Sequence, residues 1–206
     1  ICPNGIPKTI QTEPISKKNN TIPRLLFLSN LLKSKGVLVL LDAYSILKKK
    51  GYSFIGEFVG GETAEINAVC FKEEIEKRNL NNIVKYEGKK YGKEKLTYFE
   101  KADIFIFPTF YETFGLVLLE AMEHALPCIS TNEGGIPNII ENGKTGYIVQ
   151  KHSPKEIATK IEYLIKHPEL RITMGKAGKD KFEKEFTLDK FENRMKDILK
   201  DCLASI

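Results

Sequence analysis

Between residues 24 and 150, short apolar runs alternate with longer segments whose apolar residues recur at helical spacing. The runs typical of strands are 24–29, 53–59, 82–87, 103–107, 127–130 and 146–150, and the helix-like segments are 36–50, 62–79, 93–101, 114–125 and 137–141. This alternation predicts an α/β fold with a Rossmann-like, doubly wound parallel sheet of about six strands, joined by right-handed crossovers. Because such sheets bind ligands beyond the carboxyl ends of their strands, the loops that follow the strands are the ones to examine.

The two ends of the chain differ from this central part. Residues 1–22 carry three prolines and little periodicity, so we expect an interdomain linker or crossover segment there. After Ser153 the pattern is helical, with Pro154 and Pro168 near helix starts and Thr187 as a cap for a last helix. We therefore predict a nucleotide-binding domain over 23–186 and a C-terminal helix over 187–206 that packs back toward a missing amino-terminal domain. The first residue is Ile1, which favours a fragment of a longer polypeptide.

Charge and cysteine usage narrow the functional classes. The net charge is +5, from 32 Lys and Arg against 27 Asp and Glu, and the two signs are mixed along the helical segments. Nucleic-acid binding would require a denser basic stripe with interleaved aromatic residues. No run approaches the roughly 18 apolar residues of a membrane span, so we expect a soluble, cytoplasmic chain. The four cysteines form no CxxC pair, and Cys70 and Cys128 are expected to be buried free thiols.

The segment 108–146 carries the strongest chemical signal. A predicted strand ends at 107, a short loop holds Glu112, Thr113 and Gly115, and an apolar helix that carries Glu120 follows. The first turn of such a helix exposes N–H groups that favour phosphate, and a glycine there lets a ligand approach the backbone.

Glu112 and Glu120 are eight positions apart, which places their carboxylates about 10 Å apart along a helix. The two carboxylates of a glycoside hydrolase lie closer, at about 5 to 9.5 Å. The longer separation suits a sugar at one end and a ribose at the other, with a diphosphate over the helix start between them. Each carboxylate can accept two hydroxyl hydrogen bonds, as vicinal diols offer.

Residues 108–149 resemble the donor-binding core of retaining GT-B glycosyltransferases of glycosyltransferase family 4. The resemblance rests on the E-x7-E pair, the Phe-Gly-Leu after the first Glu, the Glu-Ala-Met after the second, and the Glu-Gly-Gly-Ile-Pro loop. Residues 29–36 (SNLLKSKG) look like the first phosphate-contacting loop of that family, and residues 3–5 like its interdomain linker. The resemblance implies that this chain is one half of a GT-B fold.

The resemblance also implies roles for individual residues. Glu112 and Lys35 would be the catalytic pair, with Glu112 near the donor sugar and Lys35 neutralising the diphosphate, while Glu120 would bind the ribose hydroxyls. The other donor-binding residues would be Asn30, Gly60, Gly61, Val84, Lys85, Tyr86, Thr113, Phe114, Gly115, Leu116 and Val117. Gly60 and Gly61 match a turn near the sugar, and 84–86 would flank the base. The family commonly has Arg where this chain has Asn30, and an Asn cannot offer a phosphate the charged fork of an Arg, so more would rest on Lys35.

The implied activity is transfer of a sugar from a UDP- or GDP-sugar to a glycan or lipid-linked acceptor, with retention of configuration. It would require the amino-terminal acceptor-binding domain of the same polypeptide, and the fragment alone is expected to be inactive. The chain has no Asp-x-Asp motif, and we expect neither a metal nor another cofactor. A lipid-linked acceptor would bring the protein to the inner face of the membrane as a peripheral protein; nucleic acid is not an expected partner.

Two other interpretations compete with this one. A non-catalytic nucleotide-sugar-binding or assembly module could keep the fold with a degenerate site, and the Asn30 departure mildly encourages this alternative. An NAD-dependent Rossmann enzyme is disfavoured because the first strand is followed by SNLLKSKG and lacks GxGxxG.

Overall fold

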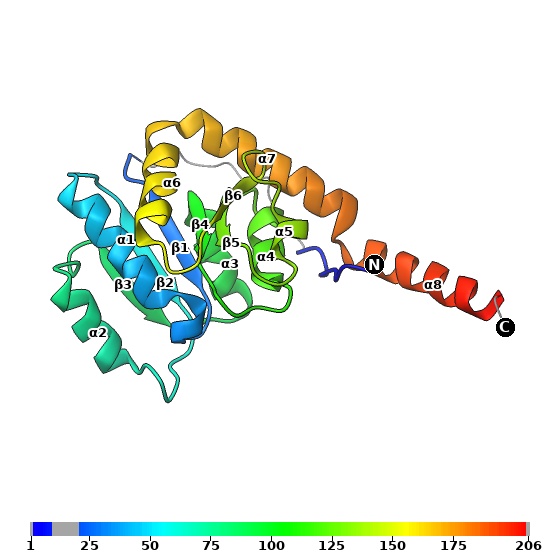
Figure 1. The fold of residues 1–206 in the computed structure, drawn as a ribbon, viewed down its shortest axis with the longest axis horizontal. Helices are drawn as coiled ribbons and strands as arrows, with labels where there is room; N and C mark the ends of the chain where they lie inside the picture. Colours follow the sequence, from blue (N-terminus) through cyan, green and yellow to red (C-terminus); the bar gives the residue numbers. More distant parts are fainter. Residues whose placement is uncertain (1, 10–20, 205–206) are drawn as a thin grey trace.

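The computed structural model describes residues 2–9 and 21–204, which form six parallel strands with helices on both faces (Figure 1). The strands are β1 (Arg24–Leu28), β2 (Ile55–Val59), β3 (Val84–Gly88), β4 (Ile104–Phe107), β5 (Cys128–Thr131) and β6 (Gly146–Val149). Their order in the sheet is β3-β2-β1-β4-β5-β6, and all five pairings are parallel. The predicted doubly wound, Rossmann-like sheet is confirmed.

The helices divide between the two faces because the strand order runs in opposite directions from β1 and from β4. The helical elements are η1 (Lys33–Lys35), α1 (Val37–Lys49), α2 (Ala68–Lys77), α3 (Gly92–Lys101), α4 (Leu116–Glu123), α5 (Ile136–Ile139), α6 (Pro154–Lys166), α7 (Pro168–Glu185) and α8 (Leu188–Ala204). Right-handed crossovers put α1 and α2 on one face and α3 and α4 on the other. α6 returns to pack against α1, and α7 packs against α4.

The core lies on both faces of the central strands. All four residues of β4 and all four of β5 are buried, as expected for strands covered by helices on both sides. Phe27 of β1 packs against Phe58 of β2 and Phe107 of β4, with ring centroids 5.2 Å and 6.3 Å apart. These aromatic contacts join the two halves of the sheet where the strand order reverses.

Two expectations about the segment 62–79 are wrong. The helix starts at Ala68 rather than at 62, because the Asn67 side chain caps it by accepting a hydrogen bond from the backbone N–H of Cys70 (2.9 Å). The preceding residues form a loop in which the Thr63 hydroxyl donates to the carbonyl of Leu31 (2.7 Å). Cys70 is exposed, because α2 turns Phe71 and Ile75 toward the core instead; Cys128 is buried as predicted.

The last helix leaves the body of the domain. Figure 1 shows α8 extending away from the sheet, with the amino-terminal residues beside its first turn. Ile6 bridges Thr187 through backbone hydrogen bonds from Ile6 N to Phe186 O (2.9 Å) and from Leu188 N to Ile6 O (2.8 Å). Thr187 caps α8 as predicted, accepting from the N–H of Lys190 (3.4 Å). The domain boundaries themselves stay predictions. Among the described helices, none has the length and apolar character needed to cross a bilayer.

A buried carboxylate ties the amino-terminal segment to α4. Glu123 is only 5% exposed, and it accepts hydrogen bonds from the backbone N–H of Thr9 and from the Thr9 hydroxyl (2.9 Å). The contact joins residues 114 positions apart in the sequence. Thr9, the last described residue before 21, is therefore anchored to the helix that also carries Glu120.

We expect Glu123→Gln to lower the free energy of unfolding by about 1–2 kcal/mol, because a neutral amide replaces the carboxylate and the contacts with the Thr9 N–H and hydroxyl lose their charge assistance. Urea unfolding followed by circular dichroism measures this loss, and the exposed Glu183→Gln is the matched control. Equal stabilities of the two variants would contradict an anchoring role for Glu123.

Candidate functional site

The site lies at the point where the strand order reverses. β1 and β4 are neighbours in the sheet, but the chain leaves β1 toward β2 on one side and leaves β4 toward β5 on the other. The helices that follow these two strands therefore lie on opposite faces of the sheet, and parallel sheets bind ligands at such a switch point, beyond the carboxyl ends of the strands. The sequence-predicted residues Asn30 and Lys35 lie in the first loop, and Glu112 to Gly115 lie in the second.

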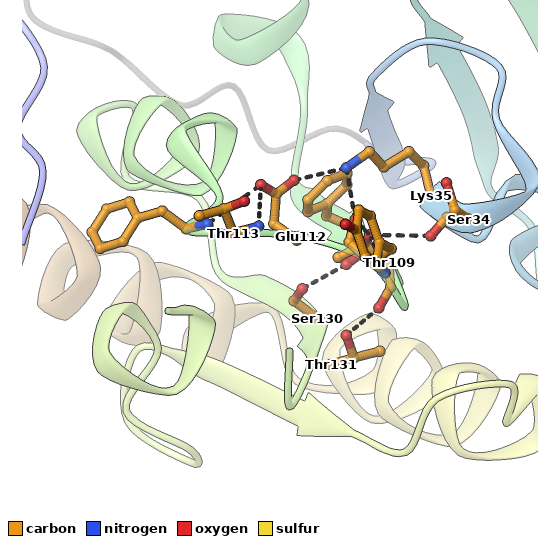
Figure 2. Close-up of polar contacts among 10 residues, drawn as sticks. Ser34, Lys35, Thr109, Glu112, Thr113, Ser130 and Thr131 are labelled. Atoms are coloured by element: carbon orange, nitrogen blue, oxygen red, sulfur yellow. Dashed lines mark hydrogen bonds and ion pairs between the residues drawn. The ribbon is translucent and has the colours of Figure 1, made fainter. Parts of the chain in front are cut away.

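Hydrogen bonds hold these two loops together (Figure 2). The carbonyl of Ser34 accepts from the backbone N–H of Phe110 (2.9 Å) and from the hydroxyl of Thr109 (3.1 Å). Thr131, at the end of β5, donates its hydroxyl to the carbonyl of Thr109. The loop after β4 is thus fixed both to the loop after β1 and to the next strand.

Lys35 and Glu112 meet across this junction. Figure 2 shows the Lys35 side chain reaching toward Glu112. The Lys35 ammonium lies 3.0 Å from Glu112 Oε2 and donates to the carbonyl of Tyr111 (2.8 Å), and both charged side chains are about one fifth exposed. The other oxygen of Glu112 accepts from the backbone N–H of Thr113 (2.9 Å). The structure therefore brings the two predicted catalytic residues into direct contact.

The amino end of α4 is open beside this pair. Gly115 precedes the helix in the left-handed conformation (φ 97°), and no side chain caps the first turn. Leu116, the first residue of α4, is exposed, and Val117 is half-buried. The uncapped N–H groups of a first helical turn, together with the positive end of the helix macrodipole, attract anions. The ring centroids of Phe114 and Phe186 lie 6.4 Å apart, so the Phe114 side chain packs against the residue that ends α7.

Gly134 and Gly135, in the loop after β5, pack against the backbone of Glu112 and Thr113. Gly135 donates its N–H to the carbonyl of Thr113 (2.9 Å). A Cβ on Gly134 would lie 2.2 Å from the carbonyl oxygen of Glu112, closer than real contacts allow. The loop can approach Glu112 and Thr113 only because residue 134 has no side chain.

Glu120 lies further along α4 and is paired with a lysine that sequence reasoning missed. Lys95 of α3 places its ammonium 2.6 Å from Glu120 Oε1. Lys95 stands among other lysines in 89–101, and nothing in that pattern distinguishes it. Only the packing of α3 beside the sheet identifies it.

The side chain of Asn30 forms a hydrogen bond with the backbone of the loop after β2. Its side-chain oxygen accepts from the N–H of Gly61 (3.1 Å), and Gly61 accepts in turn from the N–H of Leu31 (2.8 Å). A Cβ on Gly60 would lie 1.8 Å from the carbonyl oxygen of Ser29. Gly60 and Gly61 therefore let the loop after β2 pack directly on the loop after β1.

The structure does not bring all of residues 84–86 to the site. Val84 is buried in the core, and Val84 and Lys85 lie at the amino end of β3, because the strand runs from Val84 to Gly88 and pairs Val84 with Gly56 of β2. Only Tyr86 reaches the neighbouring loop, donating its hydroxyl to the carbonyl of Gly60 (2.9 Å). Burial, with a smaller effect of the Glu62 charge, raises the pKa of Tyr86 above its ordinary value.

No group of three or more His, Cys, Asp or Glu side chains is arranged to hold a metal within residues 2–9 and 21–204. Two lysine–glutamate pairs, Lys35–Glu112 and Lys95–Glu120, involve the uncapped start of α4 or the helix itself. This arrangement can bind an anion at the helix start and hydroxyl groups at the carboxylates.

Comparison with known proteins places the chain among sugar transferases. The family model described as "Glycosyl transferases group 1" matches residues 9–181. The capsular polysaccharide biosynthesis glycosyltransferase CapM of Staphylococcus aureus is 32% identical over 161 residues, which cover 78% of this chain and 41% of CapM. The chain spans less than half the length of the curated relatives that it matches.

Solved structures share the fold. A glycosyltransferase from Rickettsia africae ESF-5 superposes with a TM-score of 0.80 at 24% identity, over 97% of this chain and 56% of the other. HepE of Anabaena, in complex with UDP and glucose, superposes with a TM-score of 0.72 at 19% identity, over 84% of this chain and 48% of HepE.

Proposed function

Because this chain belongs to the glycosyl transferases group 1 family, we propose that it is the nucleotide-sugar-binding half of a retaining glycosyltransferase of glycosyltransferase family 4. Joined to an amino-terminal acceptor-binding domain, it transfers a sugar from a nucleotide-diphosphate sugar to a glycan or lipid-linked acceptor. The observation that carries the proposal is the Lys35–Glu112 pair (3.0 Å) beside the uncapped start of α4. A diphosphate at this place meets helix N–H groups and a lysine, and its sugar meets Glu112.

UDP is the nucleotide that we propose first. HepE of Anabaena has been solved with UDP, with UDP and glucose, and with UDP-glucose, and its fold is that of this chain. In the proposed complex the ribose hydroxyls bind Glu120, the diphosphate lies over Leu116 and Val117, and the sugar lies near Glu112. GDP-sugars are the alternative donors.

The proposed chemistry is a front-side displacement without a metal. The bond between the anomeric carbon and the diphosphate oxygen breaks, the acceptor hydroxyl oxygen bonds to that carbon from the same face, and its proton passes to the departing phosphate. Lys35 and the N–H groups of α4 are placed to stabilise the negative charge that develops on the diphosphate. In this protein Lys35 carries this role without an arginine at position 30, because Asn30 holds Gly61 instead.

Titration calorimetry of the chain with UDP in the presence of EDTA tests the donor site. We expect metal-free binding, and we expect Glu120→Gln to weaken it by about tenfold, because a carboxylate acceptor of two ribose hydroxyls is lost. GDP titrated in parallel identifies the base.

Failure of the chain to bind any nucleoside diphosphate would contradict the proposal and favour a degenerate, non-catalytic module. Binding that requires a divalent ion would contradict the metal-free chemistry alone.

A further inference from the structure

Each carboxylate of the proposed donor site has a lysine partner from a different element. Glu112 is paired with Lys35 of η1, and Glu120 is paired with Lys95 of α3. Lys95 and Glu120 are 26% and 29% exposed, so the pair is accessible from solvent yet partly enclosed. α3 connects β3 to β4 and packs against the central strand β1, so Lys95 comes from a helix on the same face of the sheet as α4.

The bonds of this pair leave room for a ligand. Lys95 donates to Oε1 of Glu120, while Oε2 accepts no hydrogen bond from the part of the chain that the structure describes. A carboxylate oxygen has two acceptor positions and an ammonium has three N–H donors. Oε2 and the second position of Oε1 are the acceptors that a vicinal diol requires.

We propose that Lys95 is a positioning residue for ribose recognition, which it achieves by fixing the orientation of the Glu120 carboxylate. The inference rests on the proposed function, because it assigns Lys95 to the nucleoside end of that same donor site. Without the lysine, a glutamate that is 29% exposed on a helix can rotate among several side-chain conformations. With Oε1 held from α3, Oε2 faces an incoming diol in one direction, and no rearrangement precedes binding.

The backbone carbonyl of Glu120 also has a partner, which further restricts the movement of this residue. The buried ring of His124 contacts this carbonyl through Nδ1 (2.9 Å) and stacks on Phe99 of α3, with ring centroids 5.2 Å apart. Phe99 is one turn from Lys95 on the same helix. Residues of α3 therefore hold the side chain of Glu120 directly, through Lys95, and its backbone carbonyl indirectly, through the His124 ring that stacks on Phe99.

The test compares UDP with 2′-deoxy-UDP, whose ribose lacks one of the two hydroxyls. We expect Lys95→Met to lower the affinity of the chain for UDP about fivefold and to leave 2′-deoxy-UDP nearly unchanged, so that the ratio of the two affinities falls. Lys95→Arg restores the ratio, because it keeps the charge and the donors. Lys93→Met is the matched control, since Lys93 is an exposed lysine on the same helix.

Each outcome decides something different. A wild-type chain that binds neither UDP nor GDP overturns the proposed function, and the inference with it. A chain that binds UDP, with Lys95→Met equal to Lys93→Met, overturns the inference and leaves the donor site standing. Equal losses for UDP and 2′-deoxy-UDP also overturn it, because Lys95 would then act as a general charge and not through the ribose.

Discussion

Replacing Lys35 by Met is expected to lower the affinity of the chain for UDP by about 10- to 100-fold and to leave the affinity for uridine unchanged. A hydrogen bond to a charged group contributes about 1.5–3 kcal/mol, and Lys35 is the lysine placed beside both Glu112 and the open start of α4. Uridine has the same base and ribose without the phosphates. Calorimetric titration with both ligands separates the charge effect from damage to the rest of the site.

Lys33→Met is the control for this variant, because Lys33 is an exposed lysine of the same short helix η1. Lys35 also bonds the carbonyl of Tyr111, so the thermal melting temperature of both variants is measured first. A Lys35→Met chain that binds UDP within a factor of about three of the wild type would contradict the phosphate-binding role of Lys35.

Replacing Gly36 by Ala is expected to destabilise the chain by about 3 kcal/mol or more and to remove UDP binding. Gly36 precedes α1 with φ 78°, and a Cβ there would lie 2.1 Å from the carbonyl oxygen of Pro108. This contact is with backbone, so the loops after β1 and β4 must move apart. Lys35, next to Gly36, would then lose its alignment with Glu112.

Gly51→Ala is a closely matched control for the backbone strain. Gly51 has φ 82°, and a Cβ added to it would meet nothing within 4 Å. We expect it to cost only about 1–2 kcal/mol, the penalty of a left-handed conformation for alanine. Urea unfolding of both variants measures the difference, and equal losses would show that the Pro108 contact is relieved without cost.

The sequence predicted the sheet well because buried parallel strands and amphipathic helices have different periods. Each of the six strand-like runs overlaps a strand of the structure, and Pro154, Pro168 and Thr187 stand at the helix starts where their chemistry places them. The start of α2 was predicted too early, because the apolar spacing of 62–79 hides the Asn67 cap and the Thr63 loop. Local capping competed with the periodic pattern and determined the boundary.

The candidate site was only partly predictable. Glu112, Gly115 and Glu120 stand close together in the sequence, so their motif and spacing were visible, whereas the proximity of Lys35 to Glu112 depends on the pairing of β1 with β4. Lys95 could not be identified from the sequence, because it and its partner Glu120 are 25 positions apart and lie on different helices. Val84 and Lys85 fell within the predicted strand 82–87, and their expected role beside the base came from the resemblance alone; the register of β3 with β2 places both at the start of the strand.

The hydrogen bonds between Ser34, Phe110 and Thr109 have a consequence for how a ligand is received. Loops that are free before binding lose conformational entropy when the ligand orders them, and that loss is subtracted from the affinity. Here the loops after β1 and β4 are already joined to each other and to β5, so their entropy is lost when the chain folds. In the proposed complex, the contacts of a diphosphate with Lys35 and α4 would then not be reduced by the cost of ordering these loops.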